Sequence, residues 1–145
     1  MFKNGSMDYL LSGEESGELI QIVTEAEGKE LDPENLPDEL PILPIKNAVL
    51  FPGVVMPITV SRTKSVKLVK KAYKGNRTIG VIAQSKKTDE PGFDDLFKVG
   101  TIAKILKMLV LPDGNTTIII QGQLRFETET LVSENPYLIS TYKLL

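Results

Sequence analysis

The stretch ELPILPIKNAVLFPGVVMPITVSR, residues 39–62, decides the fold because it combines a long apolar run with prolines at positions 41, 44, 52 and 57. Proline fixes φ and has no amide hydrogen, so this spacing excludes a helix through most of the stretch. Pro52-Gly53 supplies the fixed φ and then the permissive φ that a tight turn needs. The stretch therefore predicts a strand, a turn around Phe51-Pro52-Gly53, and a second strand.

The period of the apolar residues changes after Ser61. In TKSVKLVKKAYKG, apolar side chains fall on one helical face at about 100° per residue, namely Val66, Val69, Ala72 and Tyr73, with Leu68 beside them. Five lysines fall on the opposite arc: Lys64, Lys67, Lys70, Lys71 and Lys74. Ser61 or Thr63 can cap the start of this helix, and Gly75 can end it. The pattern predicts an amphipathic helix lying on a sheet.

The lysine face of this helix has three interpretations. It can be a solvated exterior, which is common for a run of charges. It can contact a sister subunit or another acidic partner, through the candidate residues Arg62, Lys64, Lys67 and Lys71. It can bind nucleic acid, with Arg77 added to that set, because clustered cations release counterions from phosphate. No aromatic side chain is interleaved with the lysines to stack bases, and this weighs against the third interpretation.

Strand patterns occupy most of the remaining sequence. Residues 78–84, TIGVIAQ, form a continuous β-branched run that fits a buried strand, and residues 85–95 form a polar loop around Pro91-Gly92. Residues 99–111 pair naturally with residues 116–121 across Asp113-Gly114, which is a hairpin signal.

Side-chain alternation adds detail to these strands. Lys104 and Lys107 have opposite parity, so a bulge or bend must separate them if both are to reach water. Residues 123–129 alternate, with Leu124 and Phe126 facing inward, and residues 137–144 form a last strand after the Asn135-Pro136 turn. The expected fold is mainly β with one principal α-helix (α+β), a small barrel or sandwich of about six strands with a helical cover.

The net charge of −2 hides a division between two parts of the chain. Residues 1–40 hold 11 Asp and Glu against 2 Lys and Arg, a net charge of −9, whereas residues 41–145 carry a net charge of +7. The acidic part contains too few apolar residues to offset the entropy of ordering its backbone. We expect residues 1–39 to form an acidic, mostly disordered tail and residues 40–145 to form the domain. The tail is either a solubilising leader or an arm that folds back on the basic domain.

The chain lacks the residues needed for several kinds of catalysis and of metal or nucleotide binding. The chain contains no His, no Cys and no G-x-x-x-x-G-K-[ST] phosphate loop. A Ser-Lys pair, such as Ser61 or Ser65 with Lys64, would need a pocket and a desolvated lysine, and an exposed basic helix offers neither. The carboxylates at 89, 90, 94 and 95 fit a surface loop better than a cation site, because their spacing is not that of an EF-hand. We expect no catalytic residue, cofactor site or metal site in this chain.

Two long blocks stand out in the chain. In the first, LPILPIKNAVLFPG is followed by a proline, a short strand and an R-x-x-S helix start. The second is DEPGFDDLFKVGTIAKILKMLVLPDG, residues 89–114, and G-x-x-R follows it at Gly122 to Arg125. In this order, the two blocks resemble the amino-terminal domain of the Lon family of ATP-dependent proteases. The resemblance covers residues 40–125 firmly and the remainder to 145 loosely.

The resemblance implies a fold and a function. The fold would be the PUA-like pseudobarrel of the Lon substrate-binding domain, and the function would be recognition of misfolded or tagged proteins and assembly of a homohexamer. The ATPase and Ser-Lys protease domains, with ATP and magnesium, would lie in parts of the full protein outside this chain. The partners would be unfolded substrates, the rest of the same polypeptide and sister subunits, in a bacterial cytoplasm. No apolar run or amino-terminal pattern indicates a membrane partner.

Apolar side chains at loops and strand ends are the candidates for such recognition. A small barrel cannot readily enclose all of them, and any that stay outside would form a patch suited to unfolded chains. The candidate substrate-contact residues are Phe51, Val54, Met56, Phe93, Leu96, Phe97, Met108 and Leu109.

Overall fold

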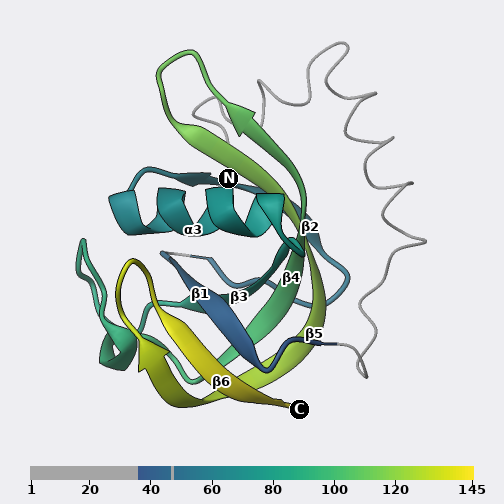
Figure 1. Cartoon of the computed structure of the whole chain (residues 1–145), viewed down its shortest axis with the longest axis vertical. Helices are drawn as coiled ribbons and strands as arrows, with labels where there is room; N and C mark the ends of the chain where they lie inside the picture. The colour runs from purple at the N-terminus through teal and green to yellow at the C-terminus, as the bar shows by residue number, and fades with distance from the viewer. Residues whose placement is uncertain (1–35, 47) are drawn as a thin grey trace.

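The computed structural model describes residues 36–46 and 48–145, and these residues form six strands and one α-helix (Figure 1). The strands are β1 (Glu39–Ile45), β2 (Val55–Val60), β3 (Thr78–Ala83), β4 (Val99–Val110), β5 (Thr116–Ser133) and β6 (Ile139–Leu144). The helix is α3 (Thr63–Lys74), and a short 3₁₀ turn, η3 (Phe93–Asp95), precedes β4. The expected fold class is confirmed, with six strands and one principal helix. The predicted tail falls almost wholly outside the described residues, and β1 already begins at Glu39.

The six strands form one sheet that closes on itself. The strand order is β2-β5-β4-β3-β1-β6, and an additional pairing joins β5 to β6. Five strands therefore form a closed ring, and β2 pairs only with the first part of β5, from Val60↔Thr116 to Val55↔Gln121. The second part of β5 pairs with β6. The long, curved β5 thus belongs both to the barrel and to the extension that carries β2 (Figure 1).

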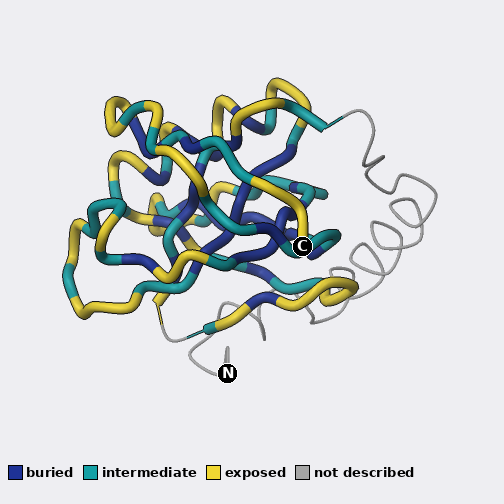
Figure 2. The backbone as a smooth tube through the Cα atoms, turned by 90° about the horizontal axis from the view of Figure 1, so that it is seen from below, coloured by how far each residue is buried: buried dark blue, intermediate teal, exposed yellow. Residues whose placement is uncertain are grey.

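Two hydrophobic clusters lie on opposite faces of the sheet. The smaller cluster fills the ring and contains Phe126 with Ile42, Ile82 and Ile102. The larger cluster lies between the sheet and α3 and includes Leu68, Val69, Ile79 and Val81. Strand β3 contributes alternate residues to each cluster, and this explains why residues 78–83 are apolar without interruption. Figure 2 shows the buried segments at the centre and the exposed ones in the peripheral loops.

Helix α3 has the predicted amphipathic character. Its buried residues are Ser65, Leu68, Val69 and Ala72, and it packs against β1 and β4. It ends at Gly75, as predicted, where the Gly75 amide donates to the carbonyls of Lys71 and Ala72. The expected cap by Ser61 or Thr63 is wrong, because the N-cap is Arg62 and no side chain there bonds the first turn. The buried Ser65 lies in the first turn of the helix and lines a pocket that is described below.

Strand β4 shows the predicted irregularity. Its pairing with β5 shifts register between Ile105 and Lys107, so one extra residue separates the two lysines of opposite parity. A second shift lies between Ile102 and Ala103, where Ala103 pairs with Gly122, and a glycine within a strand pattern commonly marks a bulge. The two strands meet at the predicted hairpin, where Gly114 has a φ of +90°.

Tyr142 ties the start of the described chain to the barrel. Its hydroxyl donates to the carbonyl of Pro37, and its ring meets Phe126 edge-on with centroids 5.9 Å apart. Burial, and then the nearby carboxylate of Asp38, raise the pKa of Tyr142 above its usual 10.0. The protonated phenol is therefore the form that the folded state favours.

A stability change with pH follows from this raised pKa. The contribution of Tyr142 to stability is present below about pH 10 and is lost as the pH rises through its folded-state pKa. Tyr142→Phe should cost about 1 kcal/mol at neutral pH, because it removes one hydrogen bond. It should also make the decline in stability at alkaline pH shallower. Urea unfolding at a series of pH values measures both effects, and an unchanged alkaline slope would contradict the assignment.

Candidate functional site

The described part of the loop between β1 and β2, residues 48–54, is held firmly against the barrel. The Val54 amide donates to the Phe51 carbonyl at 3.2 Å, and Gly53 has a φ of +84°, as the predicted turn requires. The Gly53 amide donates to the Gly122 carbonyl at 2.8 Å, and the Gly122 amide donates to the Val54 carbonyl at 2.9 Å. Leu50 is buried, and its carbonyl accepts a hydrogen bond from Thr101 Oγ1 at 2.7 Å. The loop therefore has a fixed backbone.

Three apolar side chains of this fixed loop point into solvent. Val49 is 57% exposed, Phe51 is 55% exposed and Val54 is 42% exposed. The guanidinium of Arg125, on β5, lies 5.9 Å from the centre of the Phe51 ring, within the range of a cation–π contact. A loop that exposes apolar side chains on an ordered backbone presents them without a large further loss of conformational entropy on binding.

Gly122 allows the close approach of this loop to β5. A Cβ atom on Gly122 would lie 2.4 Å from the Phe51 carbonyl oxygen, which is backbone and has no other rotamer to adopt. Gly122→Ala should therefore displace the loop and lower the free energy of unfolding by about 1–3 kcal/mol. Gly92→Ala is the matched control, since a Cβ there meets only the Asp95 side chain, at 3.7 Å. Urea denaturation of both variants measures the difference, and equal stabilities would show that the approach is not tight.

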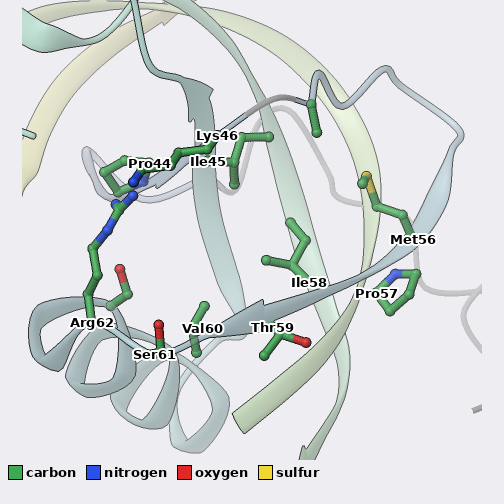
Figure 3. Close-up of a pocket in the computed structure, with 12 residues that line it drawn as sticks. Pro44, Ile45, Lys46, Met56, Pro57, Ile58, Thr59, Val60, Ser61 and Arg62 are labelled. Atoms are coloured by element: carbon green, nitrogen blue, oxygen red, sulfur yellow. The ribbon is translucent and has the colours of Figure 1, made fainter. Parts of the chain in front are cut away.

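A pocket of about 410 Å³ adjoins both ends of the loop. It lies between the end of β1, the length of β2 and the start of α3 (Figure 3). Ile45, Ala48, Met56 and Ile58 give it an apolar wall. Its polar rim consists of Lys46, Thr59, Ser61, Arg62 and Ser65. Figure 3 shows Arg62 extending from the start of α3 toward the Pro44–Lys46 end of β1.

The pocket lies beside β2, which belongs to the extension of the sheet and not to the closed ring. Among the described residues, no strand pairs with the edge of β2 that faces away from β5. Pro57 lies on β2 and Pro44 lies on β1, and both line the pocket. Proline cannot donate a hydrogen bond, so its presence on these strands discourages edge-to-edge pairing with another sheet. The pocket therefore favours contact through side chains over the addition of a full strand.

The structure brings together three of the predicted substrate-contact residues. Phe51 and Val54 are exposed on the loop, and Met56 is partly buried in the pocket wall. Phe97 is also exposed, at 55%, but it belongs to another segment, where its backbone amide donates a hydrogen bond to the carbonyl of Ala83. Contact of Phe51, Val54 and Met56 with a substrate stays a prediction, and Phe97 lies outside the surface that these three residues form.

The other predicted contact residues are less available. Leu96 is 7% exposed and is part of the core inside the ring, so its side chain offers little surface to a substrate. Phe93 is partly buried against the same cluster inside the ring. Met108 is partly buried against the larger cluster between the sheet and α3, and Leu109 is half-buried on β4. The larger cluster, beneath α3, encloses part of the apolar run at the end of β4, including Met108.

The predicted basic contacts differ from one another. Arg62 is half-buried, and its Nη2 donates to Gln84 Oε1 at 2.6 Å, so this side chain is held in place. Lys64 is exposed, and its Nζ lies 3.4 Å from the Glu134 carbonyl. Lys67 and Lys71 are exposed on the outer face of α3. Their role toward a sister subunit or an acidic partner stays a prediction.

Residues at the candidate site that sequence reasoning missed fall into two groups. Val49 and Arg125 flank Phe51, and the alternation of the strand around Arg125 showed only that it faces outward. Pro44, Ile45, Ala48 and Ile58 line the pocket, and no sequence signal shows that β1 and β2 leave a gap between them.

Two further findings concern the part of the chain that the structure describes. No group of three or more His, Cys, Asp or Glu side chains there is placed to hold a metal ion. No helix within the same residues has the length and apolarity needed to cross a membrane.

The fold and the site define a small β-barrel domain with one candidate binding surface, the β1–β2 loop and its pocket. The family model of the ATP-dependent protease La (LON) substrate-binding domain matches residues 39–145. The chain belongs to this family, and its domain is the Lon substrate-binding domain.

Comparisons with individual proteins agree with this family. The chain is 58% identical over 129 residues to the Lon protease of Cytophaga hutchinsonii, and 50% identical over 127 residues to that of Flavobacterium johnsoniae. These matches cover 88% and 87% of this chain but 16% of each relative, so the chain spans a small part of their length.

Solved structures show the same fold. The N-terminal domain of the Mycobacterium avium complex Lon protease matches with a TM-score of 0.59 and 19% identity, over 74% of this chain and 54% of that one. The Lon N-terminal domain protein from Xanthomonas campestris matches with a TM-score of 0.58 and 21% identity, over 73% and 59%. The predicted family resemblance and the pseudobarrel fold are confirmed.

Proposed function

We propose that this domain captures unfolded or misfolded proteins for degradation by a Lon protease. The observation that carries the proposal is the β1–β2 loop, which holds Val49, Phe51 and Val54 in water on a backbone that is bonded to the barrel. Such a surface accepts apolar segments without requiring one sequence, and Met56 in the adjoining pocket adapts to side chains of different shape.

The surface is small, so we expect each single contact to be weak. Binding must overcome the loss of translational and rotational freedom, and a few apolar side chains leave little surplus. Repetition of the surface around an oligomer would raise the avidity by orders of magnitude. We therefore propose that the domain works within a homohexamer in the bacterial cytoplasm. ATP and magnesium would act in an ATPase domain, and a Ser-Lys dyad in a protease domain, both outside these residues.

The rival function is nucleic-acid binding through the basic face of α3 and Arg77. The exposure of Lys64, Lys67 and Lys71 favours it, since phosphate contacts need accessible cations. Neither function requires catalysis by this chain.

Two assays test the proposal together. A clean preparation of the chain should neither hydrolyse ATP nor cleave peptides, and measured turnover would refute that half. It should bind a carboxymethylated, permanently unfolded polypeptide weakly, with an affinity that hardly changes as salt rises. A labelled RNA should lose affinity steeply over the same salt range, with a slope of about −0.7 per phosphate neutralised. Tight RNA binding with that slope, and no binding of the unfolded polypeptide, would favour the rival.

A further inference from the structure

The outer face of α3 carries an unusual concentration of one charge. The segment 62–77 contains seven Lys and Arg and no Asp or Glu. Five of these side chains are exposed: Lys64, Lys67, Lys70, Lys71 and Lys74. The buried residues of the helix face the sheet, so the lysines form one continuous surface on the other side. We call these five residues the lysine face.

No ion pair between described residues involves the lysine face, although Glu90 and Glu134 line a pocket beside Lys64. The ion pairs between described residues join Lys46 to Asp89, Lys86 to Asp95 and Lys143 to Glu127, and none of them involves α3. Several lysines are three or four residues apart, including Lys67 and Lys71, and like charges at this spacing destabilise a helix by a few tenths of a kcal/mol per pair. Acidic side chains interspersed among the basic ones would offset such repulsion, and segment 62–77 contains none. An anionic partner on this face would relieve the repulsion.

The chain itself carries that partner. Residues 1–35 hold nine Asp and Glu against two Lys, a net charge of −7, which equals in size the +7 of segment 62–77. This segment joins the domain at Leu36, which packs against the cluster inside the ring. Twenty extended residues reach about 65 Å, whereas a domain of about 100 residues has a radius of gyration of about 13 Å. The carboxylates of residues 14–34 can therefore reach α3 from that attachment point.

We propose that the acidic segment 1–35 docks in cis on the lysine face of α3. A tethered segment is present at an effective concentration near the millimolar range, so even weak charge pairing keeps the face occupied at low salt. The docked segment relieves the repulsion among the lysines and shields them from other polyanions. The proposal concerns α3 and does not depend on client capture by the β1–β2 loop.

Paramagnetic relaxation in the complete chain tests this docking directly. The chain has no cysteine, so Ser16→Cys provides a single site for a nitroxide label. At low salt the label should broaden the amide signals of residues 64–74 more than those of the rest of the domain. The broadening should disappear on raising NaCl to about 1 M, where the Debye length falls to about 3 Å. Broadening that survives at high salt, or that falls mainly on other strands and loops, would overturn the proposal.

Charge variants of the labelled chain separate specific docking from general attraction. Lys67→Gln with Lys71→Gln should reduce the broadening of α3 strongly. Lys87→Gln with Lys98→Gln removes the same charge from exposed positions outside α3 and should leave the broadening unchanged. Replacing acidic residues of segment 1–35 by Gln should abolish the broadening of α3. The residues to replace are Glu14, Glu15, Glu18, Glu25, Glu27 and Glu30. Equal effects of the two lysine pairs would overturn the proposal. A different outcome would also overturn the proposal: the label does not broaden α3, yet a single-stranded oligonucleotide binds α3 at physiological salt. The lysine face would then be a nucleic-acid site.

Discussion

Replacing Phe51 and Val54 together by Ser should weaken binding of an unfolded polypeptide by about tenfold or more. Full burial of a Phe or Val side chain contributes about 1.5–3 kcal/mol each, and both are already partly covered in the free domain. A loss of about 1.4 kcal/mol corresponds to tenfold in affinity. Fluorescence anisotropy of a labelled, carboxymethylated polypeptide measures this change. The fold should persist, since both side chains are exposed.

A second pair of exposed residues supplies the matched control. Phe97 and Val132 are 55% and 46% exposed, close to the 55% and 42% of Phe51 and Val54. Phe97→Ser with Val132→Ser therefore removes the same kinds of side chain at nearly equal exposure, away from the β1–β2 loop. This variant should bind the polypeptide almost as well as the parent. Equal losses in both variants would show that capture depends on exposed apolar area in general and would contradict the role of the loop.

Replacing Phe126 by Ala should lower the free energy of unfolding by about 3–5 kcal/mol, as expected for a fully buried Phe. Phe126 is 0% exposed and is the largest side chain of the cluster inside the ring. A Cβ on Gly80 would lie 2.8 Å from the Phe126 Cζ, so the ring occupies the space that this glycine leaves. Backbone around the closed barrel prevents collapse into the resulting cavity. For a domain of this size, such a loss lowers the melting temperature by more than about 10 °C.

Calorimetry of Phe126→Ala and Phe51→Ala side by side checks this assignment. Phe51 is 55% exposed, so its truncation should change stability by less than about 0.5 kcal/mol. A small effect at Phe126 would mean that the ring is not packed as the structure shows.

Much of the fold could be predicted because local signals agreed with the final packing. Prolines in residues 39–62 excluded a helix there. In the next segment, apolar side chains on one helical face and lysines on the opposite face predicted α3. The opposite parity of Lys104 and Lys107 revealed the bulge before Lys107. Each of these signals depends on the backbone chemistry of a few neighbouring residues, and such signals are visible in one sequence.

Closure of the sheet and exposure of particular side chains could not be predicted in the same way. Both depend on pairing between distant segments, such as β6 with β1 and with β5. Leu96 and Phe97 are adjacent in sequence and equally apolar, yet one is in the core and the other is 55% exposed. The pocket beside β2 likewise adjoins an edge that pairs with no other strand among residues 36–46 and 48–145. Pro57 is compatible with an edge position, but it does not show which segments lie beside that edge.

The most direct test of client capture is an NMR titration of the isotope-labelled chain with an unfolded polypeptide. We predict that amide shift changes will concentrate in residues 48–60, the β1–β2 loop and the β2 side of its pocket, and that they will persist in high salt. Changes confined to other parts of the domain, with residues 48–60 unaffected at saturation, would contradict the account.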